Sequence, residues 1–299
     1  MAEEYGGLKS NLKSDGWSKL GLVRVSSVIA FSALVLPFQY LMIKSGLRIW
    51  WPIAGFWHRT VCRIMGVKVQ FKGLKKHKGP VLYAANHISW LDIIILGGSL
   101  KNSSFVAKSD IEGWGTIASL CKLQKTVFVN RERRTDSARQ RDALSSRVQD
   151  GDSLILFPEG TSTDGVKMAP FKSALFSVAE RADAATDHNL LIQPLTIAYT
   201  EMNGMPIIRS QKPRVAWLGD VELFEHLREF LGMARTVVTV EFHEPTSFEA
   251  MGSRKALAKY CEAEVRGGLE RALRHEMKLG PREKVLLAAP QEAPVEEGV

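Results

Sequence analysis

The residues of this chain that best suit acid–base chemistry lie at positions 84–92, in the run Ala-Ala-Asn-His-Ile-Ser-Trp-Leu-Asp. Asp92 follows His87 by five positions, and on one continuous helix that spacing would place the two side chains about 140° apart. They can meet if His87 lies in a turn and Asp92 in the first turn of the next helix, where the helix dipole favours an acid. Such a carboxylate fixes the imidazole tautomer and stabilises the imidazolium. We therefore predict that His87 is a general base and Asp92 its partner.

Taken alone, this pair is equally typical of a loop histidine and a helix cap. A second feature is the strand-like run Phe-Val-Asn-Arg at 128–131, which ends in arginine. The planar guanidinium of Arg131 can bind phosphate through two N–H groups, so a strand end suits it to hold a phosphorylated substrate. The arginines that follow are also consistent with a solvated basic face; they are Arg133, Arg134, Arg139 and Arg141.

A third feature is the run Phe-Pro-Glu-Gly-Thr-Ser at 157–162, which follows another apolar segment. Its proline and glycine favour a tight turn, and this turn would leave Glu159 and the hydroxyls at the same sheet edge as His87. A plain strand-to-loop turn is the alternative. A fourth feature is Pro194 within a strand-like run. Because proline removes a donor from the ladder, we expect an edge strand or a bulge there.

In this order and spacing the four features resemble the sequence blocks of the glycerolipid acyltransferase family, which contains the lysophosphatidic acid acyltransferases. The blocks are N-H-x-x-x-x-D from position 86, F-V-N-R from 128, F-P-E-G-T from 157 and the proline block around 194, and they span residues 67–199. The resemblance implies an α/β fold, with a mixed central sheet flanked by helices and an N-terminal two-helix membrane anchor. It also implies transfer of a fatty acyl group from acyl-CoA or acyl carrier protein to the hydroxyl of a lysolipid.

The resemblance assigns roles to single residues. It makes His87 the catalytic base and Asp92 its partner, with no cofactor beyond the thioester co-substrate and no metal. The residues it places at the substrates are Asn86, Lys108, Arg131, Glu159, Gly160 and Thr161. Lys108, expected near the acyl carbonyl, is equally consistent with a surface lysine. These blocks contain no G-x-S-x-G motif, so we expect direct transfer without an acyl-enzyme.

One position departs from the family pattern. Many lysophosphatidic acid enzymes have arginine after F-P-E-G-T, whereas Ser162 stands there in this chain. Loss of a charged donor weakens the binding of a phosphate monoester. The first expectation for the acceptor is 1-acylglycerol-3-phosphate, and lyso-ornithine lipid, used by relatives in the same family, is the alternative. A non-catalytic membrane protein that binds anionic lipid is the rival from another class.

The elements that must position these residues follow from hydrophobic periodicity. Short apolar runs alternate with amphipathic stretches, as in an α/β domain. We predict strands at 67–71, 81–85, 126–129, 154–157, 191–198, 215–218 and 237–242. We predict helices at 91–100, 135–149 and 171–181, and a long helix whose apolar face is Leu257, Cys261, Val265, Leu269 and Leu273. Pro281 is expected to stop that helix.

The chain before residue 66 reads as a membrane anchor. Residues 25–43 are nineteen residues without a charge, which is just enough to cross about 30 Å of hydrocarbon. Residues 45–65 interleave Trp50, Trp51 and Trp57 with arginines, a mixture that suits the headgroup layer. A cleavable signal peptide or a buried soluble helix is the alternative. Basic residues on both sides leave the orientation of a single span open, which favours a hairpin that dips into the bilayer.

Composition sets the remaining expectations. A formal charge of +8 favours a partner rich in phosphate or an anionic membrane face, and nucleic acid is disfavoured because no such motif occurs. The three cysteines and seven histidines show no metal-ligand spacing. We divide the chain into a basic segment at 1–24, a hairpin at 25–65, an acyltransferase domain at 66–279 and a disordered tail at 280–299. We expect membrane lipids as partners, with the domain facing the cytoplasm; the oligomeric state is left open.

Overall fold

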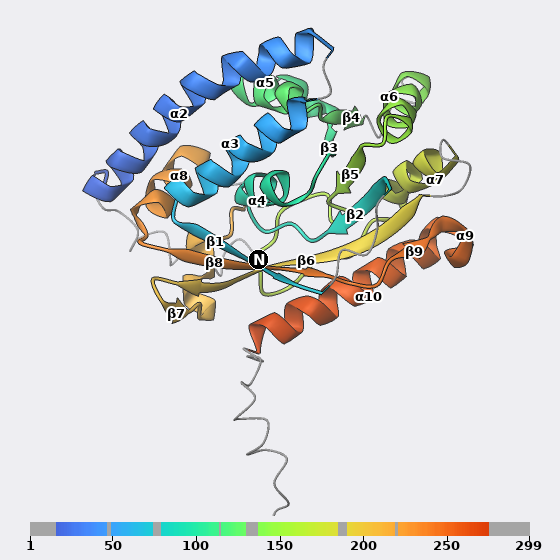
Figure 1. Ribbon diagram of the computed structural model, residues 1–299. Helices are drawn as coiled ribbons and strands as arrows, with labels where there is room; N and C mark the ends of the chain where they lie inside the picture. The colour runs from blue at the N-terminus through green and yellow to red at the C-terminus, as the bar shows by residue number, and fades with distance from the viewer. Residues whose placement is uncertain are drawn as a thin grey trace, which may run out of the picture.

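A computed structural model describes residues 16–46, 49–73, 79–113, 115–129, 137–184, 190–218 and 221–274; the side chains of 116 and 137–142 are left out as well. Within these residues the chain forms one mixed sheet with helices on both faces (Figure 1). This confirms the expected α/β class. The predicted tail, the stop at Pro281 and the first fifteen residues lie outside the described residues.

The strands bring several loops to one edge of the sheet. They are β1 (Val67–Lys72), β2 (Val81–Ala85), β3 (Ser103–Lys108), β4 (Val127–Val129), β5 (Ser153–Leu156), β6 (Leu191–Met202), β7 (Met205–Pro206), β8 (Thr236–Phe242) and β9 (Thr246–Ser247). The main order is β1-β8-β6-β2-β5-β3-β4. Strands β6, β2, β5, β3 and β4 run parallel, whereas β8 is antiparallel to β6 and parallel to β1. The carboxyl ends of the five parallel strands therefore share one edge, the usual location of sites in such sheets.

Strand β2 is buried on both faces, as expected for an apolar strand inside a parallel sheet. Because successive side chains alternate between faces, Val81, Tyr83 and Ala85 belong to one core, and Leu82 and Ala84 belong to the other. The first core lies under helices from the first half of the chain, and the second lies under the C-terminal helix. The end of β2 is thus held firmly from both sides.

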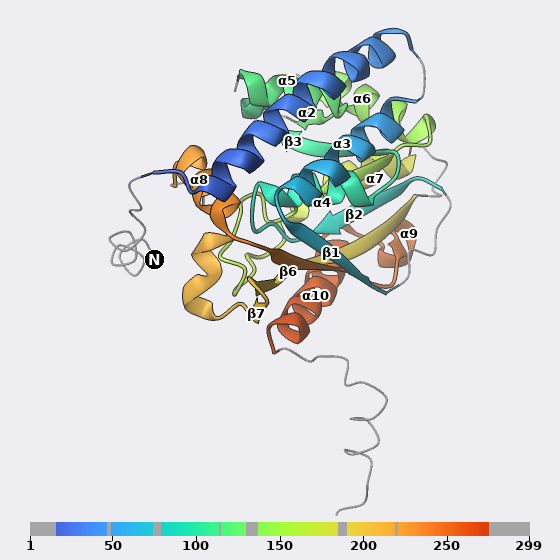
Figure 2. The ribbon, with the colours of Figure 1, turned by 60° about the vertical axis from the view of Figure 1, so that its left-hand side comes forward.

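Helices cover each face in turn (Figures 1 and 2). On the face of the first core lie α2 (Lys19–Lys44), α3 (Trp50–Ile64), α4 (Leu91–Ser99), α5 (Thr116–Leu123) and α8 (Leu223–Gly232). On the other face lie α6 (Ser137–Gln149), α7 (Ser177–Ala184), α9 (Phe248–Met251) and α10 (Arg254–Leu273). Short 3-10 helices occur at η2 (Ser109–Gly113), η4 (Ser173–Phe176) and η5 (Arg209–Arg214). In both views α2 runs alongside α3.

Most predicted elements are confirmed, but α5 and α8 were not predicted, and three further differences have a physical reason. The strand predicted at 215–218 is wrong, because Val215 follows η5 and residues 216–218 form no strand. Val215 and Ala216 are buried by packing, and the Trp217 N–H donates to the Ile88 carbonyl 2.9 Å away. Strand β3 was missed, since its first two residues are serines that the fold buries. The helix predicted at 171–181 divides into η4 and α7.

Pro194 lies in the middle of the sheet, so the expected edge strand is wrong. Its register shift does not lie at the proline either, but between Tyr199 and Glu201. The carbonyl of Pro194 accepts from the His243 N–H at 3.1 Å, between the end of the β8 ladder at Leu195 and the start of the β9 ladder at Ile192. A backbone N–H at position 194 would point to this same side of β6, where neither β8 nor β9 is paired with the strand. A proline is tolerated there because no β8 or β9 acceptor is aligned with it.

The N-terminal helices pack on the domain more closely than the sequence indicated. Trp50, Trp51 and Trp57 are 3%, 8% and 9% exposed, so these rings face protein and not the surface as expected. Arg24, which directly precedes the apolar segment, is buried and donates to the carbonyls of Leu231 (3.1 Å), Met233 and Ala234 (2.8 Å) at the end of α8. The start of α2 is therefore bonded to the rest of the fold.

Candidate active site

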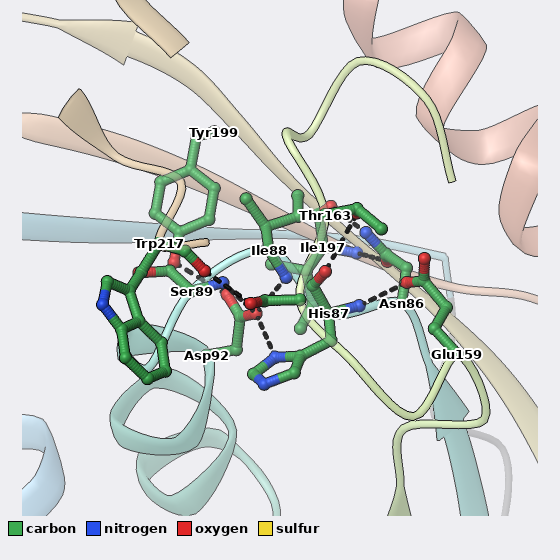
Figure 3. Close-up of polar contacts among 11 residues, drawn as sticks. Asn86, His87, Ile88, Ser89, Asp92, Glu159, Thr163, Ile197, Tyr199 and Trp217 are labelled. Atoms are coloured by element: carbon green, nitrogen blue, oxygen red, sulfur yellow. Dashed lines mark hydrogen bonds and ion pairs between the residues drawn. The ribbon is translucent and has the colours of Figure 1, made fainter. Parts of the chain in front are cut away.

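The turn between β2 and α4 brings His87 and Asp92 together. His87 follows the end of β2, and Asp92 is the second residue of α4, which begins after Trp90. The His87 Nδ1 lies 2.9 Å from the Asp92 Oδ2 (Figure 3). The predicted geometry, with the histidine in a turn and the acid in the first helical turn, is confirmed.

The Asp92 carboxylate is held by four donors. Its Oδ2 accepts the backbone N–H groups of Ile88 (2.7 Å) and Ser89 (2.9 Å) in addition to the imidazole. Its Oδ1 accepts the Tyr199 hydroxyl at 2.7 Å. Asp92 is fully buried, so these donors replace water and favour the ionised carboxylate. A carboxylate facing Nδ1 requires that this nitrogen carry the proton, which leaves the lone pair of the His87 ring on Nε2.

The His87 ring lies at an open edge of an aromatic stack. Its side chain is 17% exposed, whereas Asp92 is not exposed at all. The ring stacks on Phe157 with centroids 4.3 Å apart, and Phe157 in turn stacks on Phe105 at 6.2 Å. Nε2 points away from Asp92 in Figure 3, and no group in the described part of the chain hydrogen-bonds it. The site therefore has a fixed imidazole with one nitrogen available to a substrate.

Glu159 supports the turn from the neighbouring strand. It lies after β5, which pairs with β2, and its Oε1 accepts the His87 N–H at 2.7 Å. Its Oε2 accepts the Ala169 N–H at 2.6 Å. Burial raises the pKa of this carboxyl to about 7, although both backbone N–H groups act in the opposite direction. The structure thus places Glu159 beneath the site, where it fixes the backbone of His87, and not at the surface where the acceptor was expected.

The loop after Glu159 curls back over the same turn. Gly160 has φ of +72°, a left-handed conformation that suits glycine, and Thr161 is exposed. Thr163 donates both its N–H (2.9 Å) and its hydroxyl (3.1 Å) to the His87 carbonyl. The Ser162 hydroxyl donates to the Trp217 carbonyl at 2.5 Å. Ser162 and Thr163 consequently hold this loop against the backbone of Trp217 and His87.

Asn86 has a different environment from the expected substrate contact. Its side chain is fully buried; Nδ2 donates to the Ile197 carbonyl at 2.9 Å, and Oδ1 accepts the Ile197 N–H at 2.7 Å. The amide therefore joins the end of β2 to β6 where the two strands separate. This geometry suits a residue that positions His87 by fixing the preceding backbone.

Two further predicted site residues lie farther along the sheet edge. Lys108 ends β3 and is exposed, two strands away from β2, which at about 4.8 Å per strand is on the order of 10 Å. Arg131 lies outside the described residues, as does Asn130, and Arg139 and Arg141 have no described side chains. The described chain ahead of Arg131 ends with β4, the next strand after β3.

The sequence reasoning missed Tyr199 and the histidine that supports Trp90. Tyr199 lies 107 positions from Asp92, and it directly follows the strand predicted at 191–198, so no predicted element contained it. His226 on α8 accepts the indole N–H of Trp90 at 3.1 Å, and burial lowers the pKa of His226 to about 4, so it stays neutral. Three or more metal-ligating side chains do not gather anywhere in the described ranges.

Comparisons with known proteins agree with this geometry. A family model described as Acyltransferase matches residues 66–198. A lyso-ornithine lipid O-acyltransferase from Brucella abortus is 40% identical over 253 residues, which cover 83% of this chain and 93% of that protein. A 1-acyl-sn-glycerol-3-phosphate acyltransferase from Neisseria gonorrhoeae is 30% identical over 64% of this chain and 70% of its own. The crystal structure of the 1-acyl-sn-glycerophosphate acyltransferase from Thermotoga maritima has the same fold, with a TM-score of 0.60 at 19% identity over 84% of this chain and 94% of that one.

Proposed function

This chain belongs to the acyltransferase family and is an acyltransferase of lysolipids, and from that premise we propose that it acylates the free hydroxyl of lyso-ornithine lipid with His87 as the base. The observation that carries the proposal is the His87 imidazole, fixed through Nδ1 by a buried carboxylate, with Nε2 left at an open sheet edge. An alcohol is a poor nucleophile at neutral pH, so a positioned base is the group that this reaction needs.

The proposed reaction is a direct transfer. Nε2 of His87 takes the proton of the lysolipid hydroxyl while that oxygen attacks the thioester carbonyl carbon. The tetrahedral intermediate collapses with cleavage of the carbon–sulfur bond, and the imidazolium returns the proton to the leaving thiolate. Asp92 keeps the ring in the required tautomer and stabilises the imidazolium between the two proton transfers. Asn86 and Glu159 act one layer below, by fixing the backbone that leads into His87.

The donor is an acyl thioester, and we propose that it approaches along the edge formed by β3 and β4. Lys108 is exposed at this edge. A cationic side chain there suits the phosphates of coenzyme A and the phosphopantetheine and acidic surface of an acyl carrier protein alike. Supplying one labelled acyl chain on each carrier, at equal concentration, identifies the donor.

The acceptor is assigned from Ser162. A serine whose hydroxyl is already bound to the Trp217 carbonyl offers no charge to a phosphate monoester. The Brucella abortus relative, named for lyso-ornithine lipid, matches more of this chain at higher identity than the Neisseria gonorrhoeae relative, named for 1-acyl-sn-glycerol-3-phosphate. We therefore place lyso-ornithine lipid first and 1-acylglycerol-3-phosphate second, the reverse of the order that the sequence alone favoured.

A direct test offers purified protein both acceptors with one labelled acyl donor in detergent micelles. We expect kcat/KM for lyso-ornithine lipid to exceed that for 1-acylglycerol-3-phosphate by about tenfold or more, since one charge-assisted hydrogen bond contributes roughly 1.5 to 3 kcal/mol. Ser162→Arg should narrow or reverse this ratio, and Ser162→Ala serves as the control without a cation. A wild-type preference for the phosphate acceptor would overturn the assignment.

We also propose that α2 and α3 form the membrane anchor, with the site facing the cytoplasm. Within the described residues, α2 is the one helix long and apolar enough to cross a bilayer, and only 11% of its apolar window is buried. Its exposed side chains include Ile29 (64%), Leu34 (76%) and Leu41 (57%). Because the substrates are lipids, such a face suits a helix that lies in the bilayer beside the site.

Vesicle flotation tests the anchor. The protein should no longer float with vesicles when Leu34 and Leu41 are both changed to glutamate, and it should still float in the control variant Phe71→Glu on β1.

A further inference from the structure

Tyr199 is a buried residue that touches the catalytic pair from within the core. The residue is 1% exposed, and its hydroxyl donates to the Asp92 Oδ1 at 2.7 Å, on the opposite side of the carboxylate from His87 (Figure 3). Because Tyr199 contacts neither the imidazole ring nor the open edge, it reaches the reaction only through Asp92. It is therefore a candidate for positioning and not for direct catalysis.

The strand is built to hold this side chain in place. Leu195, Ile197 and Tyr199 alternate into the first core, and the next residue of β6 in that core is Met202, three positions later instead of two. The shift follows from the β-bulge between Tyr199 and Glu201, which inserts one extra residue against β8. Bulges of this kind end regular pairing beside a site and aim a side chain at it.

The backbone of Tyr199 has its own partner. Its carbonyl accepts the ammonium of Lys212, a buried residue of η5, at 3.0 Å. Burial lowers the pKa of Lys212 to about 8, so at neutral pH it still donates as an ammonium. With the hydroxyl bound to Asp92 and the carbonyl bound to Lys212, both ends of Tyr199 are fixed.

The Tyr199 hydroxyl stays protonated throughout the useful pH range. Burial raises its pKa well above 10, and the charge of Asp92 raises it further. The phenol is thus a permanent donor to the carboxylate. Each donor to a carboxylate draws negative charge away from the oxygen that faces the imidazole, so the number of donors determines how strongly the carboxylate stabilises the imidazolium.

Building on the proposed role of His87, we propose that Tyr199 is a positioning residue that moderates the charge of Asp92 and so sets the basicity of His87. With four donors, the carboxylate orients the ring without holding the transferred proton too tightly. Removing the phenol leaves three donors, all on Oδ2, and leaves Oδ1 buried without a partner. The imidazolium then becomes more stable, and His87 is protonated up to a higher pH.

Tyr199→Phe tests this in the full-length protein in detergent micelles, with the labelled donor and lyso-ornithine lipid. We expect the acidic limb of kcat against pH to move upward by about one unit, since one unit corresponds to roughly 1.4 kcal/mol of differential stabilisation. We expect the plateau kcat to fall about three- to tenfold and KM to stay within about twofold, because Tyr199 does not touch the substrates. A limb that stays in place overturns the proposal.

Two matched variants separate tuning from packing. Tyr83→Phe removes a buried hydroxyl from β2, in the same core, and should leave the acidic limb unmoved. Incorporation of 3-fluorotyrosine at position 199 keeps the ring shape but makes the phenol a stronger donor, so the limb should move downward, opposite to the shift in Tyr199→Phe. Shifts in the same direction for both replacements contradict the proposal.

The outcome is distinguishable from a failure of the proposed function. If the wild-type protein transfers no acyl group to any lysolipid, the proposed reaction is wrong. In that case the histidine titration followed by NMR in the wild type and in Tyr199→Phe still measures whether the proton affinity of His87 rises. If the wild type is active but neither the limb nor the NMR titration shifts, only the role of Tyr199 is refuted.

Discussion

His87 and His243 lie beside opposite faces of β6. Each has a carboxylate near Nδ1, but only His87 has its second ring nitrogen open to a substrate. On one face, His87 contacts the Asp92 carboxylate through Nδ1 at 2.9 Å and leaves Nε2 open. On the other face, His243 has Glu264 3.7 Å from Nδ1, and the Thr196 hydroxyl lies 2.7 Å from Nε2. A list of residue types, with a hydroxyl, an imidazole and a carboxylate, would not separate the two clusters.

The separation comes from what binds the second nitrogen. The one proton of the Thr196 hydroxyl is donated to the Val265 carbonyl at 3.0 Å, so Nε2–H of His243 donates to the hydroxyl oxygen. Burial lowers the pKa of His243, while Glu241 and Glu264 oppose that change. Nε2 of His243 and the Thr196 hydroxyl are thus used in a chain of hydrogen bonds that reaches α10, whereas His87 keeps Nε2 for a substrate. A catalytic histidine is therefore recognised by its unused nitrogen, and less by its carboxylate.

Replacing each of the two histidines by alanine tests this comparison most directly. His87→Ala should lower kcat by about 10²- to 10⁴-fold, the range of general base catalysis, in a protein that still folds. His243→Ala should leave kcat within about twofold at temperatures well below its Tm and should lower the free energy of unfolding. The measurements are acyl transfer rates and thermal unfolding in detergent.

Two results would reverse the assignment of His87 as the catalytic histidine. We call His243, Thr196 and Glu264 the sealed cluster. If His243→Ala abolished transfer in a protein that remained folded, the sealed cluster would be part of the active site. If His87→Ala retained most of the activity, the open histidine would be structural.

The second difference concerns the burial of two carboxyl groups, Glu159 at His87 and Glu264 at His243. Glu159 is fully buried and its pKa is raised to about 7, whereas the side chain of Glu264 is 41% exposed. A carboxyl with a raised pKa stabilises the folded state most below its ordinary value of 4.5, and this contribution is lost as pH rises through 7. The loss is on the order of 2 to 3 kcal/mol.

We therefore expect the stability of the wild type to fall between pH 5 and pH 8 relative to Glu159→Gln, which cannot ionise. The variant should be less stable overall, because its amide NH₂ faces either the His87 or the Ala169 N–H. Glu264→Gln is the matched control and should keep the wild-type pH slope. Parallel pH profiles for wild type and Glu159→Gln would contradict the raised pKa of Glu159.

The open site was largely predictable because its residues are close in the sequence. His87 and Asp92 lie on one turn, and Glu159 follows a strand that ends at the same edge. The sequence did not show that Glu159 and Asn86 bind backbone, because their partners are decided by which strands become neighbours in the sheet. Tyr199 was missed for the same reason.

Tertiary packing also explains the errors in the fold. The tryptophans of α3 have a pattern that suits a membrane interface, but the domain offers them a protein surface and buries them. Residues 215–218 are apolar because they pack on the turn between β2 and α4. They resemble a strand in composition only. In both places the apolar side chains were recognised from the sequence, but the protein surface that covers them was not.

The third and smallest expected effect comes from two adjacent glycines of α10, one of which closes the sealed cluster. A methyl group at position 268 would lie 2.3 Å from the Thr196 Oγ1 and 2.8 Å from the His243 Cε1, whereas one at position 267 would meet only the flexible Arg271 side chain at 3.3 Å. Both changes gain helix propensity of about 1 kcal/mol, but overpacking costs roughly 1 to 3 kcal/mol. We expect Gly267→Ala to raise Tm and Gly268→Ala to lower it by a few degrees, with kcat near wild type in both. Loss of transfer in folded Gly268→Ala would mean that α10 and the sealed histidine communicate with His87, and the two faces of β6 would then have to be treated as one site.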